Sequence, residues 1–135
     1  MPKVIIFEDE SFTRDMYSQK FLEVGFDVKA YEYPPTNFEN EVIREKPDAI
    51  IMDIIMPNID GFEAARRLKE NPETKDIPIF ALTNLDSDEG IDEARKIGLT
   101  DYFMKISRFP SELVNLVKEY IENPKGYMEK YDGLK

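Results

Sequence analysis

Five short apolar segments, each followed by a stretch with helical periodicity, constrain the fold of this chain more than any other feature. They are expected to be strands at 3–7, 27–31, 49–52, 79–82 and 101–104. Strands that alternate with helices form a parallel sheet wrapped by those helices. The first, third and fourth segments are continuously apolar, which is typical of strands buried on both faces. We therefore place these three at the centre of the sheet.

Apolar residues at helical spacing predict a helix after each strand. The first helix carries Phe12, Met16, Tyr17, Phe21 and Val24 on one face. The others are expected at about 37–45, from just after 61 to before 72, at 87–98 and at 110–121. Residues 123–135 lack sustained periodicity, so we expect one domain over 1–122 and a loosely held, flexible tail.

Composition restricts the chemistry that is available. The 135 residues include no cysteine and no histidine, so thiolate and imidazole chemistry is excluded. The 28 acidic and 18 basic residues give a net charge of −10, which opposes binding to nucleic acid and to anionic membranes. No apolar run approaches the roughly 20 residues that span a bilayer, and the first residues turn acidic too early for a signal peptide. We expect a cytoplasmic protein.

Polar residues stand at the carboxyl ends of four of the expected strands. Glu8 and Asp9 follow the first strand, Asp53 the third, Thr83 the fourth and Lys105 the fifth. Ligands of open parallel sheets bind beyond these ends, where the strand order reverses. The three acids and the lysine leave a net charge of about −2, which one divalent cation would neutralise, and oxygen ligands favour Mg²⁺ or Mn²⁺. The hydroxyl and the ammonium group suit a tetrahedral anion beside that cation.

This set of residues resembles the site of the response regulator receiver domains of two-component signalling, over about residues 3–121. The resemblance rests on the acid pair Glu8-Asp9, the segment Asp53-Ile54-Ile55-Met56-Pro57-Asn58-Ile59-Asp60-Gly61, Thr83, and Tyr102 three residues before Lys105. It implies a flavodoxin-like (βα)5 fold, with a five-stranded parallel sheet in the order 2-1-3-4-5 and helices on both faces. Met56-Pro57 and Asp60-Gly61 are interpreted as the turn into the third helix.

The resemblance also implies how the acidic residues act. Asp53 is the phosphoacceptor and takes a phosphoryl group in a Mg²⁺-dependent reaction. Asp53, Asp9 and the backbone carbonyl of Ile55 bind the metal directly, while Glu8 binds it through water. The implied donor is a histidine kinase or a histidine phosphotransfer protein.

The same resemblance gives roles to the remaining residues. Thr83 and Lys105 hold the phosphoryl oxygens, and Tyr102 is an aromatic switch that moves inward with Thr83, although an aromatic residue on an edge strand can also serve packing alone. The output is then a phosphorylation-dependent contact with a downstream protein, made by a stand-alone receiver that is a monomer or a phosphorylation-dependent homodimer.

Two positions depart from the family pattern. Ile106 follows Lys105, where receivers usually have a proline in a cis peptide bond. A non-proline cis bond costs about 2.5 to 4 kcal/mol, so we expect a trans bond and a lysine positioned without that bend. Asn84 follows Thr83, where the family usually has a small residue, and its side chain would crowd the phosphoryl site or hydrogen-bond to it.

Two apolar residues bear on the lifetime of the phosphorylated state. Hydrolysis needs an aligned water, and neither Ile55 nor Leu85 can hold one by hydrogen bonding. We expect a protein that catalyses its own phosphorylation and a slow self-dephosphorylation, without turning over a separate substrate.

Several other functions fit the residues less well. A carboxylate-nucleophile phosphatase needs a second acid where Ile55 stands. A flavin binder needs a phosphate-binding loop after the first strand, where Glu8, Asp9 and Glu10 would repel phosphate, and no G-x-G-x-x-G motif for a dinucleotide is present. The alternative that stays open is a receiver-like adaptor that binds partners without being phosphorylated.

Overall fold

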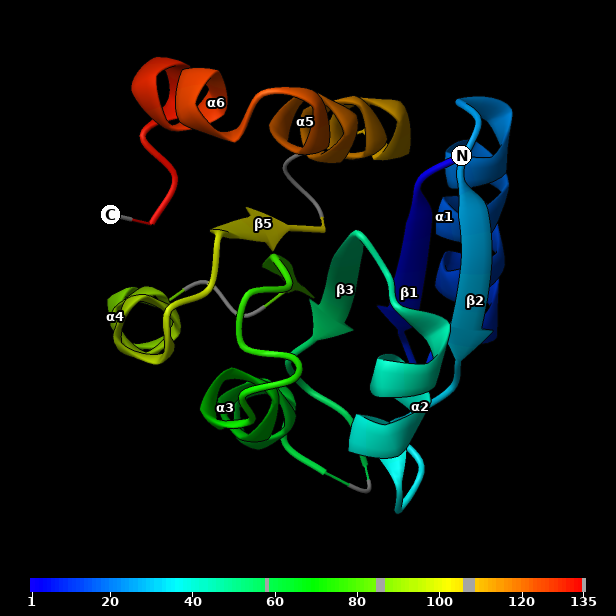
Figure 1. The fold of residues 1–135 in the computed structure, drawn as a ribbon, viewed down its shortest axis with the longest axis vertical. Coiled ribbons are helices and arrows are strands. Elements are labelled where there is room, and N and C mark those ends of the chain that lie inside the picture. The colour runs from blue at the N-terminus through cyan, green and yellow to red at the C-terminus, as the bar shows by residue number, and fades with distance from the viewer. Residues whose placement is uncertain (58, 85–86, 106–108, 135) are drawn as a thin grey trace.

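A single parallel sheet forms the centre of the molecule. The computed structural model describes residues 1–57, 59–84, 87–105 and 109–134. The strands are β1 (Lys3–Phe7), β2 (Asp27–Tyr31), β3 (Ala49–Asp53), β4 (Ile79–Thr83) and β5 (Asp101–Met104). Their order is β2-β1-β3-β4-β5, with every neighbouring pair parallel (Figure 1). This confirms the predicted flavodoxin-like topology and the three central strands.

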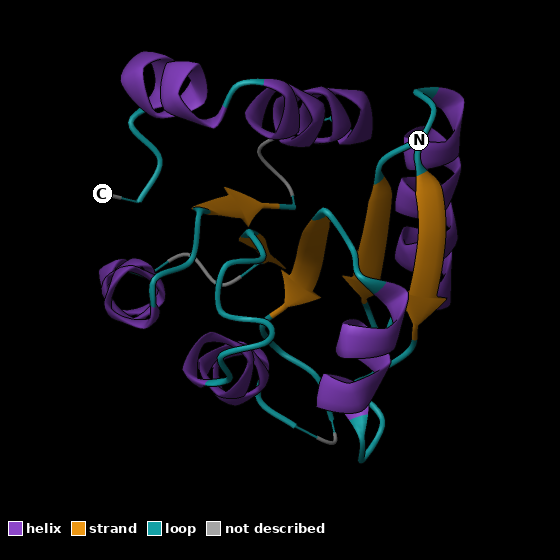
Figure 2. Ribbon diagram, in the orientation of Figure 1, coloured by secondary structure: helices purple, strands orange, loops and turns teal. Residues whose placement is uncertain are grey.

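Six helices surround the sheet within the described residues (Figure 2). They are α1 (Ser11–Glu23), α2 (Phe38–Glu45), α3 (Gly61–Glu70), α4 (Asp88–Ile97), α5 (Pro110–Glu122) and α6 (Pro124–Tyr131). Buried side chains of α2, α3 and α4 pack on one face of the sheet, and those of α1 and α5 pack on the other. None of the helices in this part of the chain has both the length and the apolar character needed to cross a membrane.

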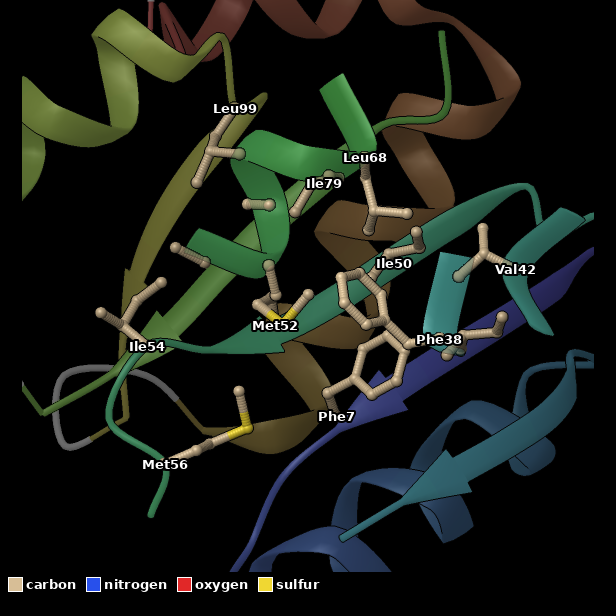
Figure 3. Packing of buried hydrophobic residues seen from close by; sticks show 14 of the residues in the cluster. Phe7, Phe38, Val42, Ile50, Met52, Ile54, Met56, Leu68, Ile79 and Leu99 are labelled. Atoms are coloured by element: carbon tan, nitrogen blue, oxygen red, sulfur yellow. The ribbon is translucent and has the colours of Figure 1, made fainter. Parts of the chain in front are cut away.

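The central strands bury side chains on both faces, as their apolar runs predict. In β3, Ile50 and Met52 belong to the core under α2, α3 and α4, while Ala49 and Ile51 belong to the core under α1 and α5. Figure 3 shows the first of these cores, where residues of the sheet meet side chains of α2 and α3 such as Phe38. This alternation holds the central strands rigidly, because successive residues of a strand point to opposite faces.

The predicted limits of the fourth helix are confirmed. The Oγ atom of Ser87 accepts a hydrogen bond of 2.9 Å from the backbone N–H of Gly90 and so caps α4. Gly98 ends the helix with a φ of +96°, which favours glycine.

The prediction for Phe12 is wrong, because this side chain is 76% exposed and does not join the apolar face of α1.

The C-terminal segment also departs from the sequence-based expectation. Residues 123–135 were expected to form a loosely held tail, but most of them form α6, which packs on α5. Asn123 caps α6 by accepting a hydrogen bond of 3.0 Å from the backbone N–H of Gly126, and Tyr127 is buried with its hydroxyl 2.6 Å from Asp101 Oδ2. An eight-residue helix held mainly by one tyrosine has no long periodic pattern, so its docking is not visible in the sequence.

Candidate functional site

Parallel strands bring the predicted polar residues to one edge of the sheet. Asp53 is the last residue of β3 and Thr83 is the last residue of β4. Glu8 follows β1, and Lys105 follows β5 with its backbone N–H donating to Thr83 O over 2.9 Å. The strand order reverses between β1 and β3, where the carboxyl edge of such a sheet leaves a crevice. All four residues therefore lie at the carboxyl edge of the sheet, where this fold binds ligands.

Three carboxylates meet at this edge. Glu8 is fully buried, Asp53 is 3% exposed and Asp9 is half-buried. One carboxylate oxygen from each residue lies within 4.8 Å of the corresponding oxygens of the other two. Such a group of acids is unfavourable without a counter-charge, because each negative charge opposes ionisation of the others.

Lys105 supplies part of that counter-charge. Its Nζ atom lies 3.4 Å from Asp53 Oδ2 and forms a closer ion pair with Glu8 Oε1. The close pairing with Glu8 was not anticipated, since the family resemblance implies that Glu8 binds a metal through water. The peptide bond between Lys105 and Ile106, expected to be trans, lies outside the described residues.

Burial is the largest single influence on the pKa values of Asp53 and Lys105. Burial and then the neighbouring carboxyl groups of Glu8 and Asp9 raise the pKa of Asp53 to about 9, while the charge of Lys105 lowers it by less. Burial acts to lower the pKa of Lys105, but contacts with Glu8 and Asp53 outweigh it and raise that pKa. In the metal-free protein, ionisation of Asp53 is therefore less favourable than ionisation of a solvent-exposed aspartate.

The cluster has the ligands that a hard divalent cation requires. Glu8 Oε2 is buried and receives no hydrogen bond from any residue in the described part of the chain. The ligand atoms at hand are carboxylate oxygens. The backbone N–H of Ile55 donates to Asp53 Oδ1 over 3.2 Å, so the backbone at Ile55 lies beside the Asp53 carboxylate. Oxygen ligands with excess negative charge fit Mg²⁺ or Mn²⁺.

The start of α3 packs closely against the backbone of Asp53 and Ile54. The backbone N–H of Gly61 donates to Ile54 O over 2.9 Å, and Asp60 Oδ1 caps α3 by accepting from Phe62 N over 2.8 Å. A Cβ atom on Gly61 would lie 2.2 Å from Asp53 O. Glycine is required here by this close approach rather than by an unusual φ, which the turn pattern in the sequence could not show.

Arg14 belongs to the site, although sequence reasoning missed it. Its Nη1 atom donates to the backbone carbonyls of Glu8, at 2.9 Å, and of Asp9, at 3.4 Å. The side chain therefore fixes the turn between β1 and α1 that carries both acids. Its position in the first turns of a helix gives no signal of this role, because many surface helices carry an arginine there.

We expect the Arg14→Met variant to bind Mg²⁺ about tenfold more weakly than the wild type, because groups that orient metal ligands contribute on this scale. Calorimetric titration with Mg²⁺ measures the effect. Arg14→Lys serves as the control, since it keeps the positive charge and loses the two-carbonyl geometry, and it should be weakened as well. Tighter binding by Arg14→Met would mean that the arginine acts by charge repulsion instead.

The two residues assigned to switching lie near each other on neighbouring strands. Thr83 is fully buried opposite Met104, and Tyr102 lies opposite Ala81 on the same pair of strands. Tyr102 is partly buried against the core formed by α2, α3 and α4. Asn84 is exposed next to Thr83, while Leu85 lies outside the described residues. Thr83 thus lies on the strand between the one that ends at Asp53 and the edge strand that carries Tyr102.

Comparison with known proteins identifies the family. The family model of the response regulator receiver domain matches residues 4–118. This chain belongs to that family. A solved receiver structure, the chemotaxis protein CheY4 of Vibrio cholerae, has a TM-score of 0.80 and 26% identity, covering 88% of this chain and 98% of the other. The receiver fold is therefore shared over nearly the whole domain.

Curated relatives of this receiver differ in length. PhoB of Pseudomonas aeruginosa, a phosphate regulon transcriptional regulatory protein, is 34% identical over 85% of this chain and 49% of its own. An uncharacterized 14.6 kDa protein of Leptolyngbya boryana is 31% identical over 87% of this chain and 88% of its own. The chain thus spans about half the length of the transcriptional regulator and most of the small protein.

Proposed function

We propose that this receiver accepts a phosphoryl group on Asp53 in a reaction that needs a divalent cation, and that it signals from the cytoplasm by a phosphorylation-dependent protein contact. The observation that carries the proposal is the buried Asp53 carboxylate, with two further acids on one side and Lys105 at 3.4 Å. A purely structural acid would not need such an arrangement. The acids and the lysine together suit the transfer of an anionic group.

The proposed chemistry is a displacement at phosphorus. One carboxylate oxygen of Asp53 forms a bond to phosphorus while the bond from phosphorus to the donor's histidine nitrogen breaks, and that nitrogen keeps the electron pair. When bound, a divalent cation would favour the ionised form of Asp53 and offset the charge of the phosphoryl oxygens. Asp9, Asp53 and the Ile55 carbonyl would hold the cation directly, and Glu8 would hold it through a water molecule.

Two further residues would receive the transferred group. The ammonium group of Lys105 lies beside Asp53 Oδ2 and would pair with a phosphoryl oxygen there. The hydroxyl group of Thr83, at the end of the neighbouring strand, would donate to another. Movement of Thr83 toward the phosphoryl group would then change the packing around Tyr102.

An apolar rim around the site supports a protein as the phosphodonor. Phe12 is 76% exposed, Ile55 60% and Phe109 74%. They come from the first turn of α1, the loop after β3 and the residue before α5, all at the carboxyl edge of the sheet. Exposed large apolar residues in one region mark an interaction surface. A histidine kinase or a histidine phosphotransfer protein would dock on this rim.

The test is an intact-mass measurement after treatment with acetyl phosphate and Mg²⁺. We expect one phosphoryl adduct on the wild type and none on Asp53→Asn, because the amide is not a nucleophile. Asp9→Asn should form less adduct and bind Mg²⁺ more weakly, since it loses one of three charged ligands. An adduct that persists in Asp53→Asn would place the chemistry elsewhere. An unmodified wild type would favour the phosphorylation-independent adaptor.

The output surface is proposed to be the face made by α4, β5 and α5, with Thr83 and Tyr102 linking it to the phosphoryl group. The downstream partner, or a second copy of the chain in a phosphorylation-dependent homodimer, would bind there. Amide exchange on phosphorylation should change mainly in these elements. Changes confined to the opposite face, around α1, would contradict this assignment.

We expect the phosphoryl group on the wild-type protein to be hydrolysed slowly. In the Ile55→Asn variant its hydrolysis should be about tenfold faster, because a positioned polar group that orients the attacking water contributes on this scale or more. Asp53 and Ile54 are buried, whereas Ile55 is exposed. A polar side chain at position 55 can therefore reach the site without disturbing the core. The measurement is the loss of the adduct with time in Mg²⁺. Ile55→Leu is the control, and equal decay of all three proteins would remove the argument from side-chain polarity.

A further inference from the structure

The C-terminal helix is an addition to the receiver. The family match ends at residue 118, and α6 begins at Pro124. Its anchor is Tyr127, which is 1% exposed, donates its hydroxyl to Asp101 at the start of β5 and contacts the ring of Tyr120 edge-on at 5.4 Å. Tyr131 adds a hydrogen bond of 2.8 Å to Glu119 of α5. The helix is thus firmly attached to both α5 and β5.

The residues after α6 turn back onto the edge of the sheet. Asp132 and Gly133 have positive φ values of 73° and 51°, which reverse the chain direction. The backbone N–H of Leu134 then donates to Thr100 O over 3.2 Å, directly before β5. We call residues 132–134 the C-terminal strap. Figure 1 shows this end of the chain descending from α6 beside β5, on the side of α4.

The C-terminal strap fits closely against α6 and the edge of the sheet. A Cβ atom on Gly133 would lie 2.7 Å from Met128 Sδ and 3.0 Å from Thr100 O, so the backbone is pressed between α6 and the sheet edge. Leu134 is partly buried against the core under α2, α3 and α4. Segments that bury little apolar surface open at low free-energy cost. The C-terminal strap buries Leu134 only in part, whereas α6 has a fully buried anchor in Tyr127. The C-terminal strap can therefore open while α6 stays attached.

The C-terminal strap and the proposed switch residue pack against one core cluster. Tyr102 and Leu134 both pack against the core under α2, α3 and α4. Asp101 joins α6 to the strand that carries the switch, because one of its oxygens accepts from Tyr127 of α6 over 2.6 Å and the other from the backbone N–H of Tyr102 over 2.8 Å. A movement of Tyr102 would repack the core cluster against which Leu134 also lies.

We propose that the C-terminal strap is an intramolecular ligand of the β5 edge, bound in the unphosphorylated receiver and released when Asp53 is phosphorylated. Its release uncovers part of the face made by α4, β5 and α5. The inference rests on the proposed function, since it needs a phosphorylated state. Because coupling between two sites is reciprocal, weakening the C-terminal strap must in turn favour the phosphorylated state.

The test uses two full-length variants that loosen the C-terminal strap without touching the acidic site. Leu134→Asp removes the apolar contact, and Gly133→Ala places a methyl group against Met128 and Thr100. Leu22→Asp, at a side chain that is 53% exposed on the far helix α1, is the matched control. The measured quantity is the affinity for beryllofluoride, a stable phosphoryl mimic, in the presence of Mg²⁺.

We expect both strap variants to bind beryllofluoride about fivefold more tightly than the wild type, as typical coupling energies between sites predict, and the control to be unchanged. In the wild type, hydrogen exchange of the Leu134 amide, followed by NMR, should accelerate on saturation with beryllofluoride. Unchanged affinity in the variants, or unchanged exchange at Leu134, overturns the proposal. If the wild type binds no beryllofluoride, the proposed function fails, and this inference fails with it.

Discussion

Replacement of Asp53 by Asn is expected to stabilise the metal-free protein by about 1 to 3 kcal/mol at neutral pH, because the wild-type fold must keep a proton on a buried carboxyl group that would ionise in water. Asp53 is 3% exposed and its pKa is raised from 3.8 to about 9 by burial and by the neighbouring acids. Lys105 keeps its closer ion pair with Glu8 in this variant. The amide has nearly the same size as the carboxyl group, so packing changes little.

The sign of the pH dependence follows from the raised pKa. Between 3.8 and about 9 the folded protein holds a proton on Asp53 that the unfolded chain has released. The free energy of unfolding therefore falls as the pH rises through this window. Asn at this position does not titrate, so the stability difference between variant and wild type should grow with pH.

Urea denaturation in the presence of a chelator, repeated across that pH window, measures the difference. Asp60→Asn is a suitable control, because it changes an exposed acid at the start of α3 outside the buried cluster. A stability difference for Asp53→Asn that stays constant with pH would show that Asp53 ionises normally in the folded protein. Excess Mg²⁺ should reduce the difference, since binding of the cation favours the ionised carboxylate of the wild type.

Replacement of Gly61 by Ala is expected to cost about 2 to 3 kcal/mol of stability, because an added methyl group meets atoms that cannot move aside. The new Cβ would lie 2.2 Å from Asp53 O and 2.6 Å from Ile54 Cα, both in the backbone. Relief of this overlap must displace either α3 or the end of β3. The second displacement moves Asp53, the proposed acceptor, so phosphorylation by acetyl phosphate should fall as well.

Gly25→Ala separates the effect of crowding from that of backbone conformation. Gly25 has a φ of +95°, but a Cβ atom there would meet nothing within 4 Å. Its replacement should cost about 1 to 2 kcal/mol through the left-handed conformation alone and leave phosphorylation unchanged. Chemical denaturation and adduct formation should be measured on both variants. If the Gly61→Ala variant and the wild type are phosphorylated to the same extent, then α3 moves in the variant and Asp53, the proposed acceptor, does not.

The sequence by itself determined the sheet and the residues at its carboxyl edge. Continuous apolar runs identify strands covered on both faces, and alternation with helices makes them parallel. Once the strands are parallel, residues that follow them must share one edge. Asp53, Thr83 and Lys105 could therefore be placed together from strand ends alone, although they are far apart in the chain.

Tertiary structure decided which atoms meet at that edge and what the C-terminus does. The pairing of Lys105 with Glu8 and the contact of Arg14 with two carbonyls depend on side-chain directions that no periodicity records. The need for glycine at position 61 comes from the approach of α3 to the backbone of Asp53. The docking of α6 depends mainly on Tyr127, which contacts Tyr120 of α5 and donates to Asp101 of β5, 26 residues earlier in the chain. Local patterns report the periodicity of a segment, whereas these contacts arise only when separate segments pack together.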